Sequence, residues 1–460
     1  MKNLQEMVRE HGVRFLDLKY TDIVGRLRHV TLPVERLDDA ARKGVGFDSS
    51  SVAGFKSVEE GDMVLKPDAG TAILDPFAKQ PTLSCFAGIH EPGSGEAYER
   101  DPRALLARAA AALVQATGAG DVMVRPEFEF YLFNSAEFYT TSASAMYRIE
   151  TDELRYDDHT GLALHKGPAY HVAPPFDRSS DFRSELASLM AACGVPVKYH
   201  HHEGGRYSQV EVEPEYLPAL QAADGVILAK YLTRNLAFRM EKSATFMPKP
   251  IHGEPGSGMH IHLSLVKDGV SLLGDKSSGT GLSRTACRFI GGILEHAPSL
   301  CALTNPSTNS YRRLTPGYEA PTLVFFSFGN RNAAIRVPGY YVSSPAELAF
   351  EYRIPDSSCN PYLAIAAVLL AGLDGITREL DPGVPFQGGL RDAQKKFGRR
   401  ALPRTLTEAL RAMRKDDGYL RREGIFSEGL LDFWYDYKLA EDESVQLRPH
   451  PWEYDLYYGC

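Results

Sequence analysis

Alternating polar and apolar side chains in two segments, within residues 125–133 and 258–265, place strong limits on how this chain folds. In a β-strand, every second side chain lies on the same face, so such a pattern predicts a strand with one polar face and one apolar face. The polar residues that share a face are Glu127 and Glu129 in the first segment, and His260, His262 and Ser264 in the second. Each segment therefore offers metal-binding side chains on a single strand face.

Two further segments carry acidic side chains in the same manner. Glu203 is followed eight residues later by Glu211, and Glu351 shares a strand face with Arg353. One such segment alone usually means a solvated outer face, so the repetition within one chain is what carries weight. Carboxylates outnumber histidines, which favours Mg²⁺ or Mn²⁺ over zinc. Together the segments predict an oxygen-rich site for two metal ions.

Size and composition limit the class of protein. At 460 residues the chain can form two domains, or one large domain with an appendage. Its formal charge of −8 argues against nucleic acid as the main partner, because phosphate binding needs a basic face. The apolar stretch 364–370 is too short to cross a bilayer, and the first residues lack the apolar core of a signal peptide. Six scattered cysteines without a Cys-x-x-Cys pair indicate reduced thiols, so we expect a soluble cytoplasmic enzyme with no membrane partner.

Turn and helix signals divide the chain near residue 102. Before this point, a short amphipathic helix and several strands predict a small α+β domain over residues 1–102. Asp101 and Pro102 then begin an alanine-rich helix that opens a second domain, residues 103–460. There, the acidic strands alternate with helices that we predict over 181–193, 224–242, 283–296 and 361–378. This order predicts a curved or closed sheet, antiparallel or mixed, with its polar residues lining one basin.

Arginines supply the other half of a phosphoryl-transfer site. They lie among the acidic strands at Arg312, Arg313, Arg331, Arg336 and Arg353. Guanidinium groups grip carboxylates with two hydrogen bonds and neutralise phosphate oxygens, while divalent metals bridge those oxygens. A loop rich in glycine and proline, residues 249–258, leads directly into the His260 strand and would let the backbone approach a ligand closely.

With these motifs in place, the chain resembles the glutamine synthetase family of the bacterial type I kind. The resemblance covers essentially the whole chain, and the motifs occur in the order that the family has. The matching residues are 47–51, 126–130, 200–203, 209–212, 246–250, 256–260, 309–314, 316–321 and 331–336, with 449–451 and 457–458 at the end. The resemblance implies an α+β fold: a small β-grasp N-terminal domain and a large catalytic domain on a curved antiparallel sheet with helices. It also implies active sites shared between subunits of a hexameric ring, and a dodecamer of two rings.

The resemblance further implies the role of individual residues. Those matching the ligands of the first metal ion are Glu129, Glu203 and Glu211, and those of the second are Glu127, His260 and Glu351. His201 and His202 match no ligand and are interpreted as structural. Residues matching the glutamate site are Arg313 and Arg353, with Gly256 and His260, and residues at the nucleotide are Arg336, His262 and Ser264.

The remaining matches concern the reaction itself. Arg331 and Arg336 match the arginines that stabilise the transferring phosphoryl group. Asp48, from the neighbouring subunit, matches the residue that binds ammonium and removes its proton, Glu319 matches the flap glutamate, and Tyr170 a wall of the ammonium pocket. The implied reaction uses ATP to phosphorylate the γ-carboxylate of L-glutamate, after which ammonia displaces phosphate to give L-glutamine.

Four departures from the family pattern stand out. Ser49 replaces a glycine after Asp48, and Pro255 replaces an asparagine before the Gly-Ser-Gly turn. Basic residues that commonly precede the Glu351 strand and touch nucleotide are absent, with Ala346 and Ala349 in that stretch. Residues 389–392 contain no tyrosine, so we expect no adenylylation there.

Other readings of the same residues remain open. A γ-glutamyl ligase of this superfamily would use an amine or polyamine in place of ammonia, although such relatives tend to lose the acidic groups that Asp48 and Glu319 supply. A non-catalytic member would not need all six predicted metal ligands. A metal-dependent hydrolase would not need the arginines together.

Overall fold

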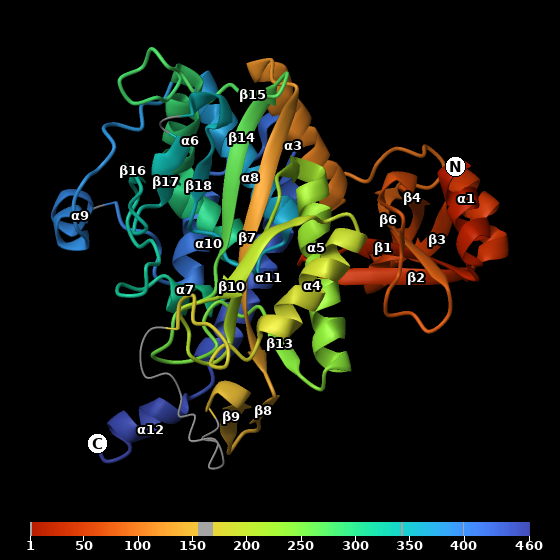
Figure 1. The fold of residues 1–460 in the computed structure, drawn as a ribbon, viewed down its shortest axis with the longest axis horizontal. Helices are drawn as coiled ribbons and strands as arrows, with labels where there is room; N and C mark the ends of the chain where they lie inside the picture. The colour runs from red at the N-terminus through yellow and green to blue at the C-terminus, as the bar shows by residue number, and fades with distance from the viewer. Residues whose placement is uncertain (1, 155–168, 342–343, 399) are drawn as a thin grey trace.

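The computed structural model describes residues 2–154, 169–341, 344–398 and 400–460, and Figure 1 shows two units side by side. The smaller N-terminal unit contains a twisted sheet in the order β2-β1-β6-β4-β3, with β5 paired to β6. Its elements are α1 (Lys2–His11), β1 (Phe15–Thr21), β2 (Leu27–Pro33), α2 (Leu37–Lys43), β3 (Val45–Asp48), β4 (Asp62–Pro67), β5 (Ile73–Leu74) and β6 (Thr82–His90). This is the β-grasp domain that the sequence led us to expect.

The strands of the small unit form where apolar side chains alternate. Leu16 and Leu18 are buried on one face of β1, which pairs antiparallel with β2 and parallel with β6. The parallel β1–β6 pair brings Leu16 beside Leu83, so the core forms between distant parts of the chain. Strand β3 lies at the sheet edge and ends at Asp48, which places that carboxylate in an exposed loop.

The larger unit is built on a curled sheet in the order β10-β11-β7-β14-β18-β17-β16. Strands β7 and β14 run through its centre, and all adjacent pairs along this order are antiparallel except β16–β17. The central strands are β7 (Asp121–Phe133), β10 (Val197–His202), β11 (Gln209–Pro214) and β14 (Met259–Lys267), followed by β16 (Phe326–Phe328), β17 (Ile335–Val337) and β18 (Phe350–Tyr352). Shorter strands at its margins are β12 (Leu217–Pro218), β13 (Ser243–Thr245) and β15 (Val270–Ser271).

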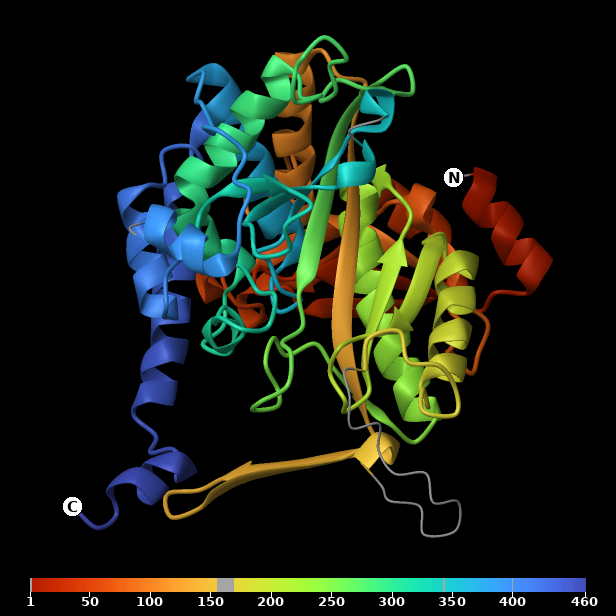
Figure 2. The same ribbon diagram turned by 60° about the vertical axis from the view of Figure 1, so that its left-hand side comes forward.

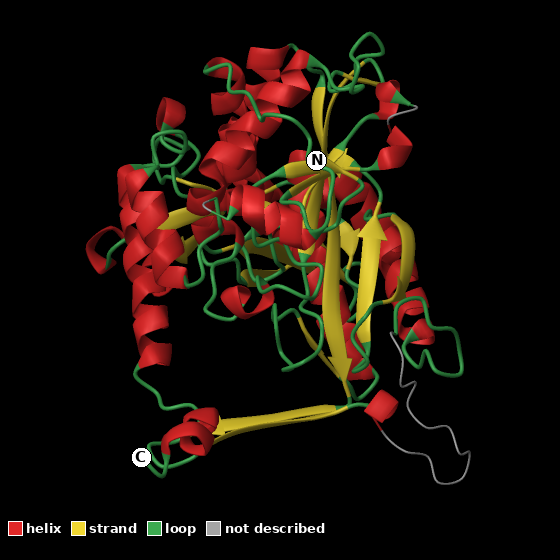
Figure 3. Cartoon of the chain, turned by 90° about the vertical axis from the view of Figure 1, so that its left-hand side faces the viewer, coloured by secondary structure: helices red, strands yellow, loops and turns green. Residues whose placement is uncertain are grey.

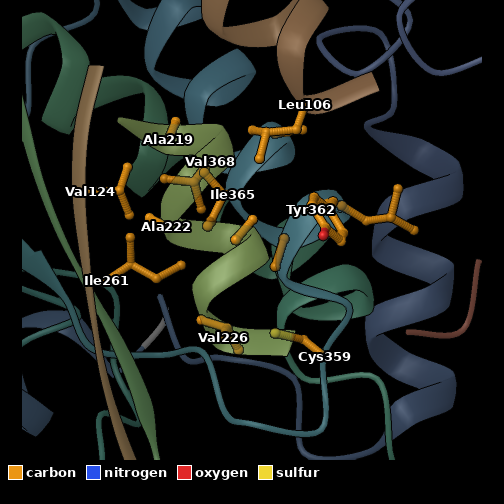
Figure 4. Packing of buried hydrophobic residues seen from close by; sticks show 14 of the residues in the cluster. Leu106, Val124, Ala219, Ala222, Val226, Ile261, Cys359, Tyr362, Ile365 and Val368 are labelled. Carbon is orange, nitrogen blue, oxygen red and sulfur yellow. The ribbon is translucent and has the colours of Figure 1, made fainter. Parts of the chain in front are cut away.

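Helices cover one face of this sheet and bury its apolar side chains. Figure 4 shows Val124 and Ile261 of the central strands facing α5, with α8 in the next layer. The helices of this unit are α3 (Pro102–Thr117), α4 (Ser180–Ala192), α5 (Ala219–Arg239), α6 (Arg284–Thr304), α7 (Ser310–Arg313), α8 (Pro361–Thr377), α9 (Leu390–Phe397), α10 (Leu406–Lys415), α11 (Glu428–Gln446) and α12 (Pro451–Tyr457). With the apolar face of the sheet filled in this way, its polar face remains for the site.

Two helices extend beyond the predicted ranges. Helix α6 continues through Pro298 to Thr304, although we predicted its end at His296. The residues after the proline, such as Leu300 and Leu303, are buried, so packing offsets the hydrogen bond that proline cannot make. Helix α5 begins at Ala219, directly after Pro218, and not at Asp224. None of the helices formed by the described residues has the length and apolar character required to cross a membrane.

One asparagine side chain contacts both units. The side-chain oxygen of Asn360 accepts hydrogen bonds from the first turn of α8, as an N-cap does. Its amide nitrogen donates to the carbonyls of Asp22 and Ile23 in the small unit, at 3.1 and 3.0 Å. Gly25 has φ of +88°, and a Cβ there would lie 3.0 Å from Asn360 Cα, so the contact requires glycine.

Two segments project from the same end of the larger unit, as Figures 2 and 3 show. One is the hairpin of β8 (Ser135–Thr140) and β9 (Ala145–Glu150), and the other is the C-terminal helix α12. Both carry exposed apolar side chains, including Phe138 on the hairpin at 80% and Tyr458 after the helix at 84%. Such projecting apolar segments are typical of contacts with another chain.

Candidate active site

The strand register brings the predicted site residues together on the polar face of the curled sheet. Residues paired across neighbouring strands lie about 5 Å apart, so their side chains form continuous rows. The paired residues are His201 with Glu211, Glu211 with Glu129, Glu127 with His260, Arg125 with His262, His262 with Glu351, and Glu351 with Arg336. Side chains from five strands, β10, β11, β7, β14 and β18, thus share one acidic surface with Arg336 of β17 at its edge.

The first group of candidate ligands lies at the β10, β11 and β7 side. Ligand atoms of His201, Glu203 and Glu211 lie within 4.8 Å of one another. His201, which the sequence analysis left as structural, has its Nε2 3.4 Å from Glu211 Oε1. Glu129 pairs with Glu211 across β7 and β11, and the Gln209 amide donates to Glu129 Oε2 at 3.1 Å. The three carboxylates assigned to the first metal ion are therefore neighbours.

The electrostatics of this group favour a bound cation. Burial and the nearby carboxylates raise the pKa of Glu203 well above its usual value, with Glu129 the largest neighbour. Burial, then Glu127 and Glu203, raise the pKa of Glu211 in the same manner. Glu203 Oε2 is buried without a hydrogen-bond partner among the described residues. Carboxylate oxygens are the donors that Mg²⁺ and Mn²⁺ prefer, so these residues fit a divalent ion.

The second group lies around Glu127. His260 Nδ1 is 3.2 Å from Glu127 Oε1 and 3.4 Å from Glu351 Oε1. His262 Nε2 is 2.7 Å from Glu127 Oε2, and ligand atoms of His262, Glu127 and Glu351 also lie within 4.8 Å of one another. The structure thus places His262, which we predicted at the nucleotide, directly beside the carboxylate assigned to the second metal ion.

Two arginines neutralise Glu351. Arg336 Nη1 is 2.6 Å from Glu351 Oε2, and Arg353 Nε is 2.8 Å from Glu351 Oε1. Burial alone would raise the pKa of Glu351, but Arg353 and His262 outweigh it and hold this pKa at about 2. Arg353 also donates to the carbonyl of Glu319, an exposed residue with φ of +57°. This bond ties the loop of the predicted flap to the site.

Arg313 lies on the other side of His260. It is buried and donates to the carbonyls of Ile354 and Arg353, at 2.7 and 3.1 Å. A Cβ added at Gly256 would lie 2.7 Å from Arg313 Cγ and 2.6 Å from the carbonyl oxygen of Pro248. Only glycine fits this close approach, so the loop places its backbone directly beside the guanidinium.

Tyr170 and Arg331 lie toward solvent at the mouth of the acidic surface. Tyr170 is 46% exposed, and its ring stacks on His171 at a centroid distance of 4.0 Å. Burial lowers the pKa of Arg331, but Tyr170, Glu351 and Glu319 outweigh this and raise it overall. Both side chains therefore lie within electrostatic range of the predicted metal ligands.

Asp48 is not part of this assembly within one chain. Its carboxylate accepts hydrogen bonds from Ser50 and Ser51 in its own loop, and these bonds lower its pKa. Within the described parts of the chain, its hydrogen-bond partners all come from that loop, in the small unit. The Asp48 carboxylate thus lies outside the hydrogen-bond network of the acidic surface, as far as the described residues show.

A cavity of about 510 Å³ opens at the far end of β7 and β14. Ser264 lines it, and its hydroxyl donates to the carbonyl of Leu348 at 2.9 Å. Ala346, where a basic residue is common in the family, lines the same cavity. Its charged lining includes Arg125, Lys198, Glu215 and Glu347.

Sequence reasoning did not assign four residues to the site. Arg125, Gln209 and Glu213 lie on strands that carry predicted ligands, and His201, interpreted as structural, lies near the end of β10, two residues before Glu203. Arg125 shares its strand face with Glu127, and Gln209 and Glu213 share theirs with Glu211, so the period of two already contained the signal. His201 lies two residues before the predicted ligand Glu203, so the same period indicated it, and the β10–β11 register places it opposite Glu211.

A curled sheet lined with carboxylates, histidines and arginines, joined to a β-grasp domain, defines a class of enzyme suited to phosphoryl transfer with divalent cations. Family models agree in detail: "Glutamine synthetase, beta-Grasp domain" matches residues 12–92, and "Glutamine synthetase, catalytic domain" matches residues 99–457. The chain belongs to the glutamine synthetase family.

Individual relatives match along their full length. A glutamine synthetase of Rhizobium meliloti is 42% identical over 99% of this chain and 98% of its own, and one of Streptomyces filamentosus is 39% identical with the same coverage. Among solved structures, the glutamine synthetase of Plasmodium falciparum has a TM-score of 0.89 at 25% identity, covering 99% of this chain and 98% of its own. A ligand-free structure named GmaS has a TM-score of 0.81 at 28% identity, with complete coverage of both chains.

Proposed function

We propose that this chain is a glutamate–ammonia ligase, which joins ammonia to the γ-carboxylate of L-glutamate and converts ATP to ADP and phosphate. The observation that carries the proposal is the row of carboxylates on one sheet face, with Arg336 and Arg353 bound to Glu351 at its edge. A carboxylate is a poor electrophile, so the reaction passes through γ-glutamyl phosphate, from which phosphate leaves readily. The role is glutamine biosynthesis, and with it nitrogen assimilation.

Two divalent ions, Mg²⁺ or Mn²⁺, belong to each site in this proposal. Glu129, Glu203 and Glu211 would hold one ion, and Glu127, His260 and Glu351 would hold the other. When bound, the ions neutralise charge on the phosphate oxygens and orient them. The raised pKa values of Glu203 and Glu211 support this, because such a concentration of buried negative charge needs a counterion.

The arginines and the glycine loop hold glutamate in this proposal. Arg313 and Arg353 bind its carboxylates beside Gly256 and His260, and guanidinium groups are suited to this because they offer paired donors. Arg331 and Arg336 stabilise the phosphoryl group as it moves. ATP reaches them from the cavity at Ser264, whose volume of about 510 Å³ is large enough for a nucleoside.

Ammonia is received by acidic groups. Asp48 of a neighbouring subunit binds ammonium and removes its proton, and Tyr170 forms a wall of the pocket. Glu319 closes over the acyl phosphate, because water would otherwise hydrolyse it. The left-handed conformation of Glu319, and the bond from Arg353 to its carbonyl, support a defined position for that loop.

The enzyme is a type I dodecamer of two stacked hexameric rings in this proposal. Exposed apolar side chains on the β8–β9 hairpin and on α12 support further contacts between subunits. Free cysteines throughout the described chain support a reducing, cytoplasmic location. Light scattering tests the assembly, and a fully active monomer would contradict it.

The decisive test is ADP release with glutamate and different nitrogen donors. We expect ammonia to support turnover at least tenfold better than methylamine, ethanolamine or putrescine, since an alkyl group leaves a carboxylate of the pocket unpaired, at about 1–3 kcal/mol each. Faster turnover with a polyamine would replace the proposal with a γ-glutamyl-amine ligase. ADP release without any glutamate dependence would reject both.

A further inference from the structure

Arg125 is a buried charge next to the proposed active site for which the proposed function gives no role. It lies on β7, and only 2% of its surface is exposed. Its Nη2 is 2.8 Å from Glu213 Oε1 and 3.1 Å from His262 Nδ1, and its guanidinium lies 4.6 Å from the centre of the Tyr216 ring. Burying an arginine is costly, so contacts this specific call for an explanation.

The chemistry of arginine settles the state of His262. A guanidinium group only donates hydrogen bonds, so Nδ1 of His262 must be the acceptor. Neutral imidazole with an accepting Nδ1 carries its proton on Nε2. That proton points to Glu127 Oε2, which lies 2.7 Å from Nε2. Arg125 therefore determines which way His262 donates.

The contacts that run from Arg125 through His262 end at Glu127, a proposed metal ligand. With Oε2 of Glu127 bound by His262, Oε1 is the oxygen that faces His260 Nδ1 at 3.2 Å. The charge of Arg125 is itself balanced, because Glu213 Oε1 lies 2.8 Å from it and 2.9 Å from Lys198 Nζ. The arrangement thus holds His262 and Glu127 in place at one end and is charge-compensated at the other.

We propose that Arg125 is a positioning residue which, through His262, orients Glu127 toward the second metal ion. This inference rests on the proposed function, because Glu127 is a metal ligand only in that proposal. Residues that hydrogen-bond to metal ligands, and so orient them, typically contribute tenfold to a hundredfold to metal affinity. In this arrangement His262 orients Glu127, and Arg125 holds His262 in place.

Metal binding tests the proposal without turnover. Titrating metal-free protein with Mn²⁺, followed by calorimetry and by the electron paramagnetic resonance signal of free Mn²⁺, should give two binding events in the wild type. Arg125→Met should weaken one of them by about tenfold to a hundredfold and leave the other within about twofold. Arg125→Lys, which retains the positive charge and an ammonium group that donates hydrogen bonds, should recover part of the loss. A merely structural arginine would affect both sites or neither.

A double variant tests whether the effect passes through His262. His262→Leu removes the link, so Arg125→Met combined with His262→Leu should bind Mn²⁺ as His262→Leu alone does. Additive losses would overturn the proposal. To separate a folding defect from a metal effect, Arg125→Met combined with Glu213→Gln removes the carboxylate that loses its arginine partner and should show the same loss at one site.

Arg183 offers a matched control. It is also buried, pairs with Asp177 at 2.6 Å and donates to Nδ1 of a histidine, His200, at 3.3 Å. Among its described contacts, His200 reaches no predicted metal ligand, so Arg183→Met should leave both Mn²⁺ affinities unchanged. If Arg125→Met bound Mn²⁺ as the wild type does, the role of Arg125 would be overturned, and the proposed function would stand. A wild-type protein that binds no Mn²⁺ would overturn the proposed function as well.

Discussion

At the scale of single residues, the acidic surface divides into two halves with opposite electrostatics. Glu127 and Glu351 have histidine or arginine partners, which hold their pKa values low despite burial. Glu203 and Glu211 have mainly each other and further carboxylates, and with burial these raise their pKa values. Without a cation, repulsion is therefore concentrated in the half assigned to the first metal ion.

Glu211→Gln should stabilise the metal-free protein and abolish part of its response to metal. The change removes a buried like charge, so we expect the melting temperature without metal to rise by about 1–3 °C at pH 8. Adding Mn²⁺ should then raise the melting temperature less than it raises that of the wild type. Differential scanning calorimetry in chelator and in Mn²⁺ measures both effects.

The exposed residue Glu60 provides the comparison, because Glu60→Gln removes a carboxylate that has solvent around it. That variant should keep the wild-type melting temperature in both conditions. An undiminished response to Mn²⁺ in Glu211→Gln would remove Glu211 from the metal site.

At this scale, the sequence predicted which residues belong to the site better than it predicted which residues they contact. The period of two identified the strand faces that carry Glu127, Glu129, His260 and His262. It could not show that Arg125 meets His262, because this depends on the register between β7 and β14, which many long-range contacts determine together. The assigned roles of the site residues remain predictions until binding is measured.

At the scale of secondary-structure elements, one histidine connects three helices of the larger unit. His296 of α6 lies 2.8 Å from Asp374 of α8 and 2.7 Å from Asp416 at the end of α10. Its ring stacks on Tyr419 at 4.0 Å. Burial lowers the pKa of His296, but the two aspartates outweigh it and raise the pKa above 6.5.

The contacts of His296 with Asp374 and Asp416 predict a pH-dependent contribution to stability. A histidine with a raised pKa stabilises the fold fully below its unfolded pKa of about 6.5, and the contribution is lost as the pH rises through the raised value. His296→Gln should therefore cost about 1–2 kcal/mol at pH 6 and clearly less at pH 9. Denaturant unfolding of both proteins at the two pH values measures the difference, and an equal cost at both would contradict the role of charge.

Several elements could be predicted from local signals, and others could not. Asp101 and Pro102 marked the start of α3, and the structure has Asp101 as its N-cap and Pro102 as its first residue. The continuation of α6 beyond Pro298 and the β8–β9 hairpin were missed. The first depends on burial against distant helices, and the second is an exposed two-stranded sheet whose stability requires support that its own sequence does not reveal.

At the scale of the whole molecule, the separation of Asp48 from the acidic surface is the main observation. If each site combines Asp48 of one subunit with Glu127 of the next, two inactive variants should complement each other. A one-to-one mixture of Asp48→Ala and Glu127→Ala, dissociated and reassembled, should recover about a quarter of wild-type activity, because random assembly pairs the intact halves in that fraction of sites. ADP release before and after reassembly measures this.

Mixing Glu127→Ala with Glu351→Ala provides the control, since both changes affect the same half of the site and should not complement. Recovery in that control, or none in the first mixture, would contradict shared sites. Each variant must first show the assembled mass of the wild type by light scattering.

Asn360 has a consequence for how this chain can be divided. Its one side chain both caps α8 and binds two carbonyls of the β-grasp domain, so a gene cut near residue 102 would yield two fragments that each expose polar groups meant to be covered. The boundary between the units is thus poorly suited to recombination, and a β-grasp domain grafted from a relative would need a matching loop around Gly25. The Asn360 amide is thus one of the contacts that favour inheritance of the two domains as a pair.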